Sequence, residues 1–178
     1  MRKHNGMRPQ DIVILLKIIA LGEKDWQLKD LARTLFISPS EVTESLNRSK
    51  SGNLIDYNKR KVNRQNLFEF IEHGLKYAFP QYPGTMTNGL PTAHAHPFMN
   101  KHFNSELLYV WADNKGDVRG LSIEPLYPNQ VKAIKEDDTL YKLLALIDVI
   151  RVGRTREKNI AITELKKVIL NEPSYQHS

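Results

Sequence analysis

The sequence predicts a mostly helical protein of the α+β class. It is expected to have an N-terminal unit of three helices and a short hairpin, then a small α+β region with one β-hairpin and two C-terminal helices. One observation behind this is that helix-starting and helix-ending residues bracket apolar segments near residues 9–21, 27–36 and 38–52. Another is that short strand-like runs flank turn sequences at 57–60 and 113–117. The chain has 178 residues, of which 40% are hydrophobic, so it is long enough for a packed core.

The first two expected helices differ in how much of their surface is apolar. The first begins at Pro9 and ends at Gly22, a usual placement of proline and glycine at helix ends. Residues 12–21 are apolar apart from Lys17, so most faces of this helix are expected to be buried. The second, over residues 27–36, has a single apolar stripe at spacings of three and four. That stripe consists of Leu28, Leu31, Ala32 and Leu35.

The third expected helix has a well-defined start. Ser38 is a favoured N-cap, Pro39 suits the first helical position, and Glu41 follows the serine by three residues, as in a capping box. Val42 and Leu46 lie one turn apart and would anchor the helix to the core.

A short hairpin and a fourth helix are expected to complete the first predicted domain, residues 1–78. Residues 54–56 and 61–62 are expected to pair around the turn at 57–60. The helix that follows, over 64–78, again has one apolar face.

The rest of the chain is divided by its proline content. Residues 79–106 are predicted to be a connecting loop, because four of the nine prolines fall within 79–97. Residues 107–178 form the last predicted region, for partner binding or dimerisation. It is expected to begin with a hairpin in which 107–112 and 118–123 flank the sequence DNKGD.

Two helices are predicted at 138–152 and 156–170. The first of them is apolar on more than one face, so it is either central to a second core or part of a subunit interface. Arg151, Arg154 and Arg156 lie between the two helices. They either bind phosphate or an acidic partner, or they satisfy the last carbonyls of the preceding helix.

Composition narrows the class of function. The net charge is +6, and residues 1–78 carry 14 lysines and arginines against nine acidic residues, whereas the remaining residues carry 12 against 11. The positive excess near the N-terminus is compatible with a nucleic-acid partner. There is no cysteine and no apolar run long enough for a membrane span. Because phosphate-loop and hydrolase motifs are also missing, we expect a cytoplasmic protein that is not an enzyme and has no cofactor.

A histidine pair raises the question of a metal. His94 and His96 form a His-x-His sequence with His102 nearby, and such spacing can bind zinc. Since no carboxylate lies close in sequence before Glu106, no metal site is predicted. For residues 84–97 there are two alternatives. They form a loop that binds an effector or a partner, or a loop that packs on the body of the protein.

Residues 28–46 have the pattern of a helix-turn-helix. Ala32 is small, as required where two helices cross, and Ile37 is an apolar residue that can fill the gap between them. Phe36 departs from the helix-turn-helix pattern, because many such motifs have a glycine at this position, where the backbone adopts a left-handed conformation. A helical hairpin with a purely structural role would share part of this pattern.

The outer face of the third helix is polar, and the turn after it is basic. Hydroxyl, amide and guanidinium groups donate to base edges and phosphates, and a basic hairpin tip can lie along the DNA backbone or in the minor groove. The predicted DNA-binding residues are Ser38, Ser40, Thr43, Asn47, Arg48, Lys50, Lys59, Arg60, Lys61 and Arg64. Glu41 and Glu44 are unfavourable near phosphate, unless Glu41 caps the helix. A solvated charged turn is the alternative reading of the basic residues.

Residues 9–64 resemble the winged helix-turn-helix domain of MarR-type bacterial regulators. The resemblance rests on QLKDLARTLFISPSEVTESLNRSKSGNLI followed by DYNKRKV. The whole chain also resembles a group of poorly characterised bacterial winged-helix proteins, through NLFEFIEHGLKYAFP, GLPTAHAHP, VRGLSIEPLYP and ALIDVIRVGRTRE. MarR regulators dimerise through added helices at both ends, whereas this chain continues into a hairpin and helices, so that mode of dimerisation is not carried over.

The resemblance implies a transcriptional regulator that binds duplex DNA in a sequence-specific way. Its third helix would enter the major groove and its basic wing would contact the backbone, with a homodimer on a palindromic site expected by analogy. The alternative is a protein-interaction module, such as the antidote or accessory half of a two-gene system. In that case the winged helix would be a scaffold, and residues 79–178 would bind the protein partner.

Overall fold

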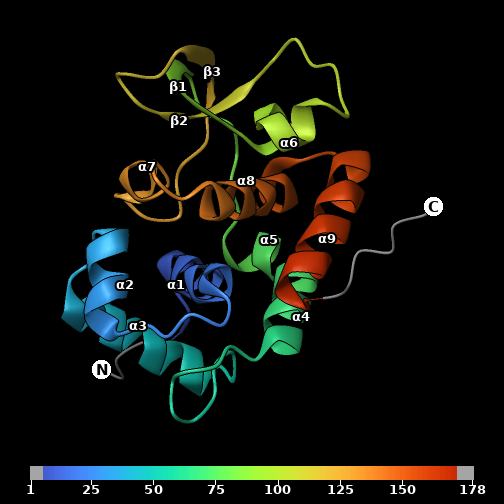
Figure 1. Cartoon of the computed structure of the whole chain (residues 1–178). Coiled ribbons are helices and arrows are strands. Elements are labelled where there is room, and N and C mark those ends of the chain that lie inside the picture. Colours follow the sequence, from blue (N-terminus) through green and yellow to red (C-terminus); the bar gives the residue numbers. More distant parts are fainter. Residues whose placement is uncertain (1–5, 172–178) are drawn as a thin grey trace, which may run out of the picture.

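The computed structural model describes residues 6–171 and shows an α+β chain with one small sheet at one end and most of the helices packed below it (Figure 1). The mostly helical class predicted from the sequence is thereby confirmed. The N-terminal part contains α1 (Pro9–Leu21), α2 (Leu28–Leu35), α3 (Pro39–Ser51), α4 (Arg64–His73) and α5 (Leu75–Ala78). The remainder contains β1 (Met86–Thr92), the 3-10 turn η1 (Ala93–Ala95), α6 (Pro97–Asn100), β2 (Tyr109–Ala112), β3 (Val118–Ser122), α7 (Gln130–Ala133), α8 (Asp138–Val152) and α9 (Thr155–Ile169).

Helix α8 runs through the centre of the molecule. It lies between the small sheet and α1, and it also contacts α4, α5 and α9 (Figure 1). Its buried residues extend from Leu140 to Ile150, so residues 138–152 are part of a core, as one alternative predicted, but that core is shared with the N-terminal helices and is not a second one. One cluster of buried apolar side chains includes Ile12 of α1, Leu67 of α4 and Leu165 of α9. The domain boundary predicted at residue 78 therefore does not divide the core.

The ends of α1 follow the sequence prediction. Pro9 is the first helical residue, and the Asp11 carboxylate accepts a hydrogen bond of 2.8 Å from the backbone N–H of Arg8. Gly22 ends the helix with a φ of 61°, a left-handed value that a residue with a Cβ rarely adopts.

The turn between α2 and α3 is left-handed without a glycine. Phe36 has φ 55° and ψ 42°, a left-handed conformation that glycine adopts more readily than other residues. Two side chains from the second half of the chain hold this end of α2: the Tyr127 hydroxyl donates to the Leu35 carbonyl at 2.8 Å, and Asn129 Nδ2 donates to the Phe36 carbonyl at 2.9 Å. These bonds satisfy carbonyls that the helix end leaves unpaired.

The predicted hairpin after α3 is present in a minimal form. Ile55 and Val62 make an isolated antiparallel bridge rather than two strands. Burial acts to raise the pKa of Asp56, but hydrogen bonds from the backbone N–H groups of Lys61 and Arg60, together with their charges, lower it below its usual value. The turn of this hairpin is thus fixed by a carboxylate within it.

The helix predicted over residues 64–78 is broken in two. Gly74 separates α4 from α5, and the ring of Phe70 lies only 3.0 Å from where a Cβ on that residue would be. The sequence prediction of one continuous helix was wrong at this glycine, which caps α4 through its N–H to the Phe70 carbonyl at 2.8 Å.

The predicted hairpin of residues 107–112 and 118–123 is also corrected. Strands β2 and β3 do not pair as a hairpin; each pairs antiparallel with β1, and they meet each other in parallel (Figure 1). The first half of β1 pairs with β3 and its second half with β2, so that the three strands close on one another. The strand β1, which pairs antiparallel with both expected partners, comes from the segment predicted to be a loop.

The connecting loop predicted over 79–106 therefore contains β1, η1 and α6. Gly89 and Pro91, which in the sequence are signs of a loop, both lie within β1. For Gly89 the structure gives a reason. A Cβ on Gly89 would collide with the carbonyl oxygen of Trp111 on the neighbouring strand, and one on Gly116 would collide with the backbone of Gly89. Glycine marks a close approach of two backbones here rather than a flexible linker.

We expect Gly89→Ala to lower the free energy of unfolding by about 3 kcal/mol, because the added methyl has to displace the backbone of β2. Urea unfolding followed by circular dichroism measures this change. Gly52→Ala is the matched control, since its φ is −82° and its nearest contact would be an ordinary 3.6 Å. A loss for Gly89→Ala no larger than for this control would contradict the close packing of β1 on β2.

No helix within residues 6–171 is both long enough and apolar enough to cross a lipid bilayer.

Candidate nucleic-acid interface

Helix α3 presents a polar face to solvent and an apolar face to the core. Val42 and Leu46 are buried, as the sequence predicts, whereas Ser40 and Asn47 are exposed on the other side. The Thr43 hydroxyl donates to the Pro39 carbonyl at 3.0 Å, so it is partly used within the helix. The exposed face therefore offers the Ser40 hydroxyl and the Asn47 amide most directly.

The start of α3 is capped on one side only. The Ser38 hydroxyl accepts a hydrogen bond of 3.2 Å from the N–H of Glu41, which confirms the predicted N-cap. In a capping box, the Glu41 carboxylate would accept a hydrogen bond from the backbone N–H of Ser38. Here it accepts from Gln10 Nε2 of α1 instead, at 3.0 Å. The sequence interpretation of Glu41 as half of a capping box was wrong, since α1 lies close enough to bind it.

The hairpin after α3 folds against the outer face of that helix. Lys59 Nζ donates to Asn47 Oδ1 at 3.0 Å, and Lys50 Nζ lies 3.8 Å from the centre of the Tyr57 ring. These contacts bring Lys50 and Lys59 beside the exposed amide of Asn47. Tyr57 is 80% exposed, and reasoning from charge alone missed it, although a tyrosine in a charged turn is the feature that would have identified it.

Arg48 is not part of this surface. Its guanidinium is buried against α1, where Nε and Nη2 donate to the two carboxylate oxygens of Asp11 at 2.9 and 2.8 Å. The Asp11 hydrogen bond raises the pKa of Arg48 above its ordinary value. The prediction that Arg48 lies on the outer face of α3 was wrong, because that flank of the helix is covered by α1.

Arg60 and Arg64 are also engaged within the protein. Arg60 Nη2 donates to Asp25 Oδ1 and to the Trp26 carbonyl at 2.9 and 2.7 Å, and its guanidinium lies 4.1 Å from the Trp26 ring centre. Arg64 Nη1 donates to the Ile169 carbonyl at the end of α9, at 2.9 Å. As placed here, neither guanidinium extends toward α3, which differs from the arrangement predicted from the sequence.

Of the predicted basic residues, Lys50 and Lys59 lie beside the outer face of α3, and Lys61 lies in the same hairpin but on the side that faces Trp26. Lys61 is exposed, and within the described residues its side chain forms no ion pair. Glu41 and Glu44 are acidic exceptions, because both lie exposed on the same helix. We give the name α3 face to the exposed residues Ser38, Ser40, Asn47, Tyr57 and Lys61 together with the half-buried residues Thr43, Lys50 and Lys59.

The three histidines do not converge on a common point. His94 Nε2 lies 2.7 Å from the Leu107 carbonyl, whereas His96 Nδ1 accepts from the N–H of Phe98 at 3.1 Å. His102 packs against Phe98. Within the part of the chain that the structure describes, no group of three histidine or carboxylate side chains could hold a metal ion.

His96 is expected to make stability depend on pH. Its burial, with a smaller contribution from the nearby charge of Lys142, lowers its pKa to about 4. An unfolded histidine has a pKa of about 6.5, so unfolding takes up a proton between these values. Stability is therefore lost as the pH falls from about 6.5 to 4, by at most about 3 kcal/mol.

The variant His96→Asn isolates this contribution, because asparagine retains a side-chain acceptor for the Phe98 N–H. Urea unfolding at about pH 7 and pH 4.5 should show the wild type losing about 2 kcal/mol more than the variant on acidification. Equal losses in the two proteins would mean that the imidazole is protonated in the folded state.

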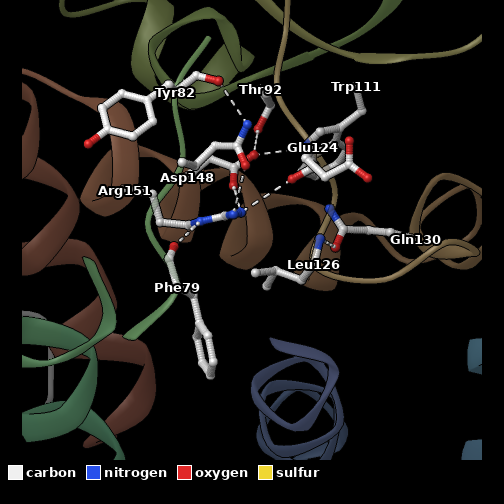
Figure 2. A network of polar contacts seen from close by, with 10 residues as sticks. Phe79, Tyr82, Thr92, Trp111, Glu124, Leu126, Gln130, Asp148 and Arg151 are labelled. Carbon is white, nitrogen blue, oxygen red and sulfur yellow. Dashed lines mark hydrogen bonds and ion pairs between the residues drawn. The ribbon is translucent and has the colours of Figure 1, made fainter. Parts of the chain in front are cut away.

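The Arg151, Arg154 and Arg156 cluster is divided by the structure. Arg151 is buried and pairs with Asp148 at 3.1 Å, and it also donates to the carbonyls of Phe79 and Glu124 (Figure 2). Arg154 and Arg156 are exposed. The structural alternative thus holds for Arg151, although its guanidinium binds a buried carboxylate and distant carbonyls rather than the last carbonyls of its own helix.

Asp148 is the centre of this buried network, which joins α8 to the sheet. It accepts from Trp111 Nε1 at 2.6 Å and from the Thr92 hydroxyl at 2.8 Å (Figure 2). Burial raises the pKa of Asp148, and the Arg151 charge and the hydrogen-bond donors oppose that rise. Because its polar groups are satisfied by one another, we assign the network to stability rather than to binding.

No family model, curated protein or solved structure significantly matches this chain. The function is therefore argued from the α3 face and its surroundings.

Proposed function

We propose that this protein binds duplex DNA through the α3 face, as a winged helix-turn-helix protein of the kind that MarR-type regulators represent. The observation that carries the proposal is the contact between Lys59 and Asn47. It places a cationic hairpin directly beside the exposed polar side of α3, and a helix with an adjoining basic wing is a common arrangement for contacting a major groove and its flanking phosphates.

Roles within the α3 face follow from chemistry. Ser40 and Asn47 have donors and acceptors that suit base edges, with Asn47 able to make paired hydrogen bonds to adenine. Lys50, Lys59 and Lys61 supply positive charge for the phosphate backbone. Acting as a regulator of transcription, the protein would bind as a homodimer on half-sites about 34 Å apart.

Removing a phosphate contact has a distinct effect on salt dependence. We expect Lys59→Ala and Lys61→Ala each to weaken DNA binding on all sequences and to reduce the slope of log affinity against log salt by about 1. Fluorescence anisotropy with labelled duplexes between about 50 and 200 mM salt measures that slope. Arg60→Ala is expected to reduce stability more than the slope, because Arg60 is bound to Asp25 and Trp26.

Arg119→Ala is the matched control, since it removes one exposed positive charge from β3, at the far end of the molecule from α3 (Figure 1). Its slope should equal that of the wild type. If Lys59→Ala and Lys61→Ala also retain the wild-type slope, the hairpin does not contact DNA and the proposal fails.

A further inference from the structure

A second candidate binding site lies far from the α3 face, where α9 begins. It is a cavity of about 440 Å³ between the start of α9 and the chain that leads into β2, and we call it the α9 cavity. Its apolar wall is formed by Phe103, Leu107, Tyr109 and Val152. Sites for small molecules commonly have about 300–1,000 Å³. The other lining residues of the α9 cavity are polar or charged, so it suits a ligand that has both an apolar part and a polar group.

The rim of the α9 cavity is positively charged. Arg154 and Arg156 line it, both are exposed, and among the described residues neither guanidinium forms an ion pair or a hydrogen bond. The acidic group in the lining is Glu157, whose Oε2 accepts from the N–H of Arg154 at 2.6 Å. The two arginines outnumber this one carboxylate, so the charged groups at the opening leave an excess of one positive charge.

A buried polar side chain also lines the cavity. His94 is only 5% exposed, and its Nε2 lies 2.7 Å from the Leu107 carbonyl. A carbonyl oxygen can only accept, so Nε2 carries the hydrogen of this bond. The bond fixes the imidazole in the wall of the cavity, against the chain that leads into β2.

We propose that the α9 cavity binds a small organic anion with an apolar body. The apolar body packs on Leu107, Tyr109 and Val152, and the acidic group reaches Arg154 and Arg156. Inorganic phosphate would leave the apolar wall uncovered, and a neutral apolar molecule would leave both guanidinium groups without a counter-charge. This binding is independent of the proposed contact with DNA, because it uses none of the residues of the α3 face.

Octanoate is a suitable probe, and 1-octanol is its neutral counterpart. Titration of isotope-labelled protein, followed by amide chemical shifts, should show octanoate moving the resonances of Ser105, Leu107 and residues 152–157 in a saturable way. We expect octanol to bind about tenfold more weakly, because it lacks the charge-assisted bonds. Shifts that are absent from this region, or equal affinities for the two probes, would overturn the proposal.

The double variant Arg154→Ala/Arg156→Ala tests the rim directly. We expect its octanoate affinity to fall about tenfold, to the level of octanol. Arg119→Ala removes an exposed arginine elsewhere and should bind octanoate as the wild type does. A double variant with an unchanged chemical-shift spectrum and unchanged octanoate affinity would show that the arginines do not bind the anion.

Discussion

Replacing Asp11 with alanine is expected to lower the free energy of unfolding by about 3–5 kcal/mol. The carboxylate is fully buried and accepts from Ser45 Oγ at 2.6 Å as well as from two nitrogens of Arg48. Without it, the buried Arg48 guanidinium has no counter-charge, and removing one member of a buried pair costs far more than the pair contributes. Urea unfolding followed by circular dichroism measures the loss.

A double-mutant cycle distinguishes the ion pair from a simple cavity. We expect Asp11→Ala and Arg48→Ala together to cost about 2 kcal/mol less than the sum of the single changes, because the second removal breaks no remaining pair. Asp117→Ala removes an exposed carboxylate and should change stability by no more than about 0.5 kcal/mol. Strict additivity of the two changes would contradict the pairing of α1 with α3.

The second large effect is expected at Arg151, whose replacement by alanine should also cost about 3–5 kcal/mol. Its side chain donates to Asp148, to the carbonyls of Phe79 and Glu124, and to Gln81 Oε1. The variant leaves the Asp148 carboxylate buried without a counter-charge and leaves the other acceptors without this donor. The same unfolding measurement applies, and near-ultraviolet circular dichroism should report loosening around Trp111, which bonds to Asp148.

Arg154→Ala is the matched control, because it removes an arginine three residues further along that is exposed. It should change stability by no more than about 0.5 kcal/mol. The loss of stability for Arg151→Lys should lie between the losses for Arg151→Ala and Arg154→Ala, since an ammonium cannot reproduce the planar guanidinium that contacts several acceptors at once. If Arg151→Ala and Arg154→Ala had equal effects, the buried network would not hold α8 to the sheet.

The N-terminal helices were predictable from sequence because their apolar periodicity and their capping residues agree. The ion-pair partners of charged residues within the apolar helices could not be predicted in the same way, since these partners are distant in the chain. Asp11 pairs with Arg48, and Lys17 of α1 pairs with Asp137 at 2.6 Å. Asp148 and Arg151 are an exception: they lie three residues apart in one helix, so their pairing was open to sequence reasoning.

Strand β1 was missed for a physical reason. Its glycine and proline are typical of loops, and only the packing of Trp111 and Gly116 against Gly89 shows why a glycine is needed there. Pairing of β2 and β3 as a hairpin was inferred from the turn between them, but β1 pairs with both strands. Local sequence patterns do not reveal which strand from elsewhere in the chain becomes the neighbour.

The candidate interface was predicted in part. Helical spacing correctly placed Ser40 and Asn47 outside and Val42 inside. Arg60 was counted with the basic tip, although Trp26 and Asp25 hold it against the loop before α2. A count of positive charges cannot tell which of them are already bound within the protein.

The central claim is that the α3 face binds duplex DNA, and one titration tests it most directly. Fluorescence anisotropy should compare the purified protein on labelled DNA from upstream of its own gene with a scrambled duplex, at about 50 and 200 mM salt. We predict tighter binding to the upstream DNA that persists at the higher salt. No binding to either duplex at either salt would contradict the claim and would make the three N-terminal helices a scaffold for a protein partner.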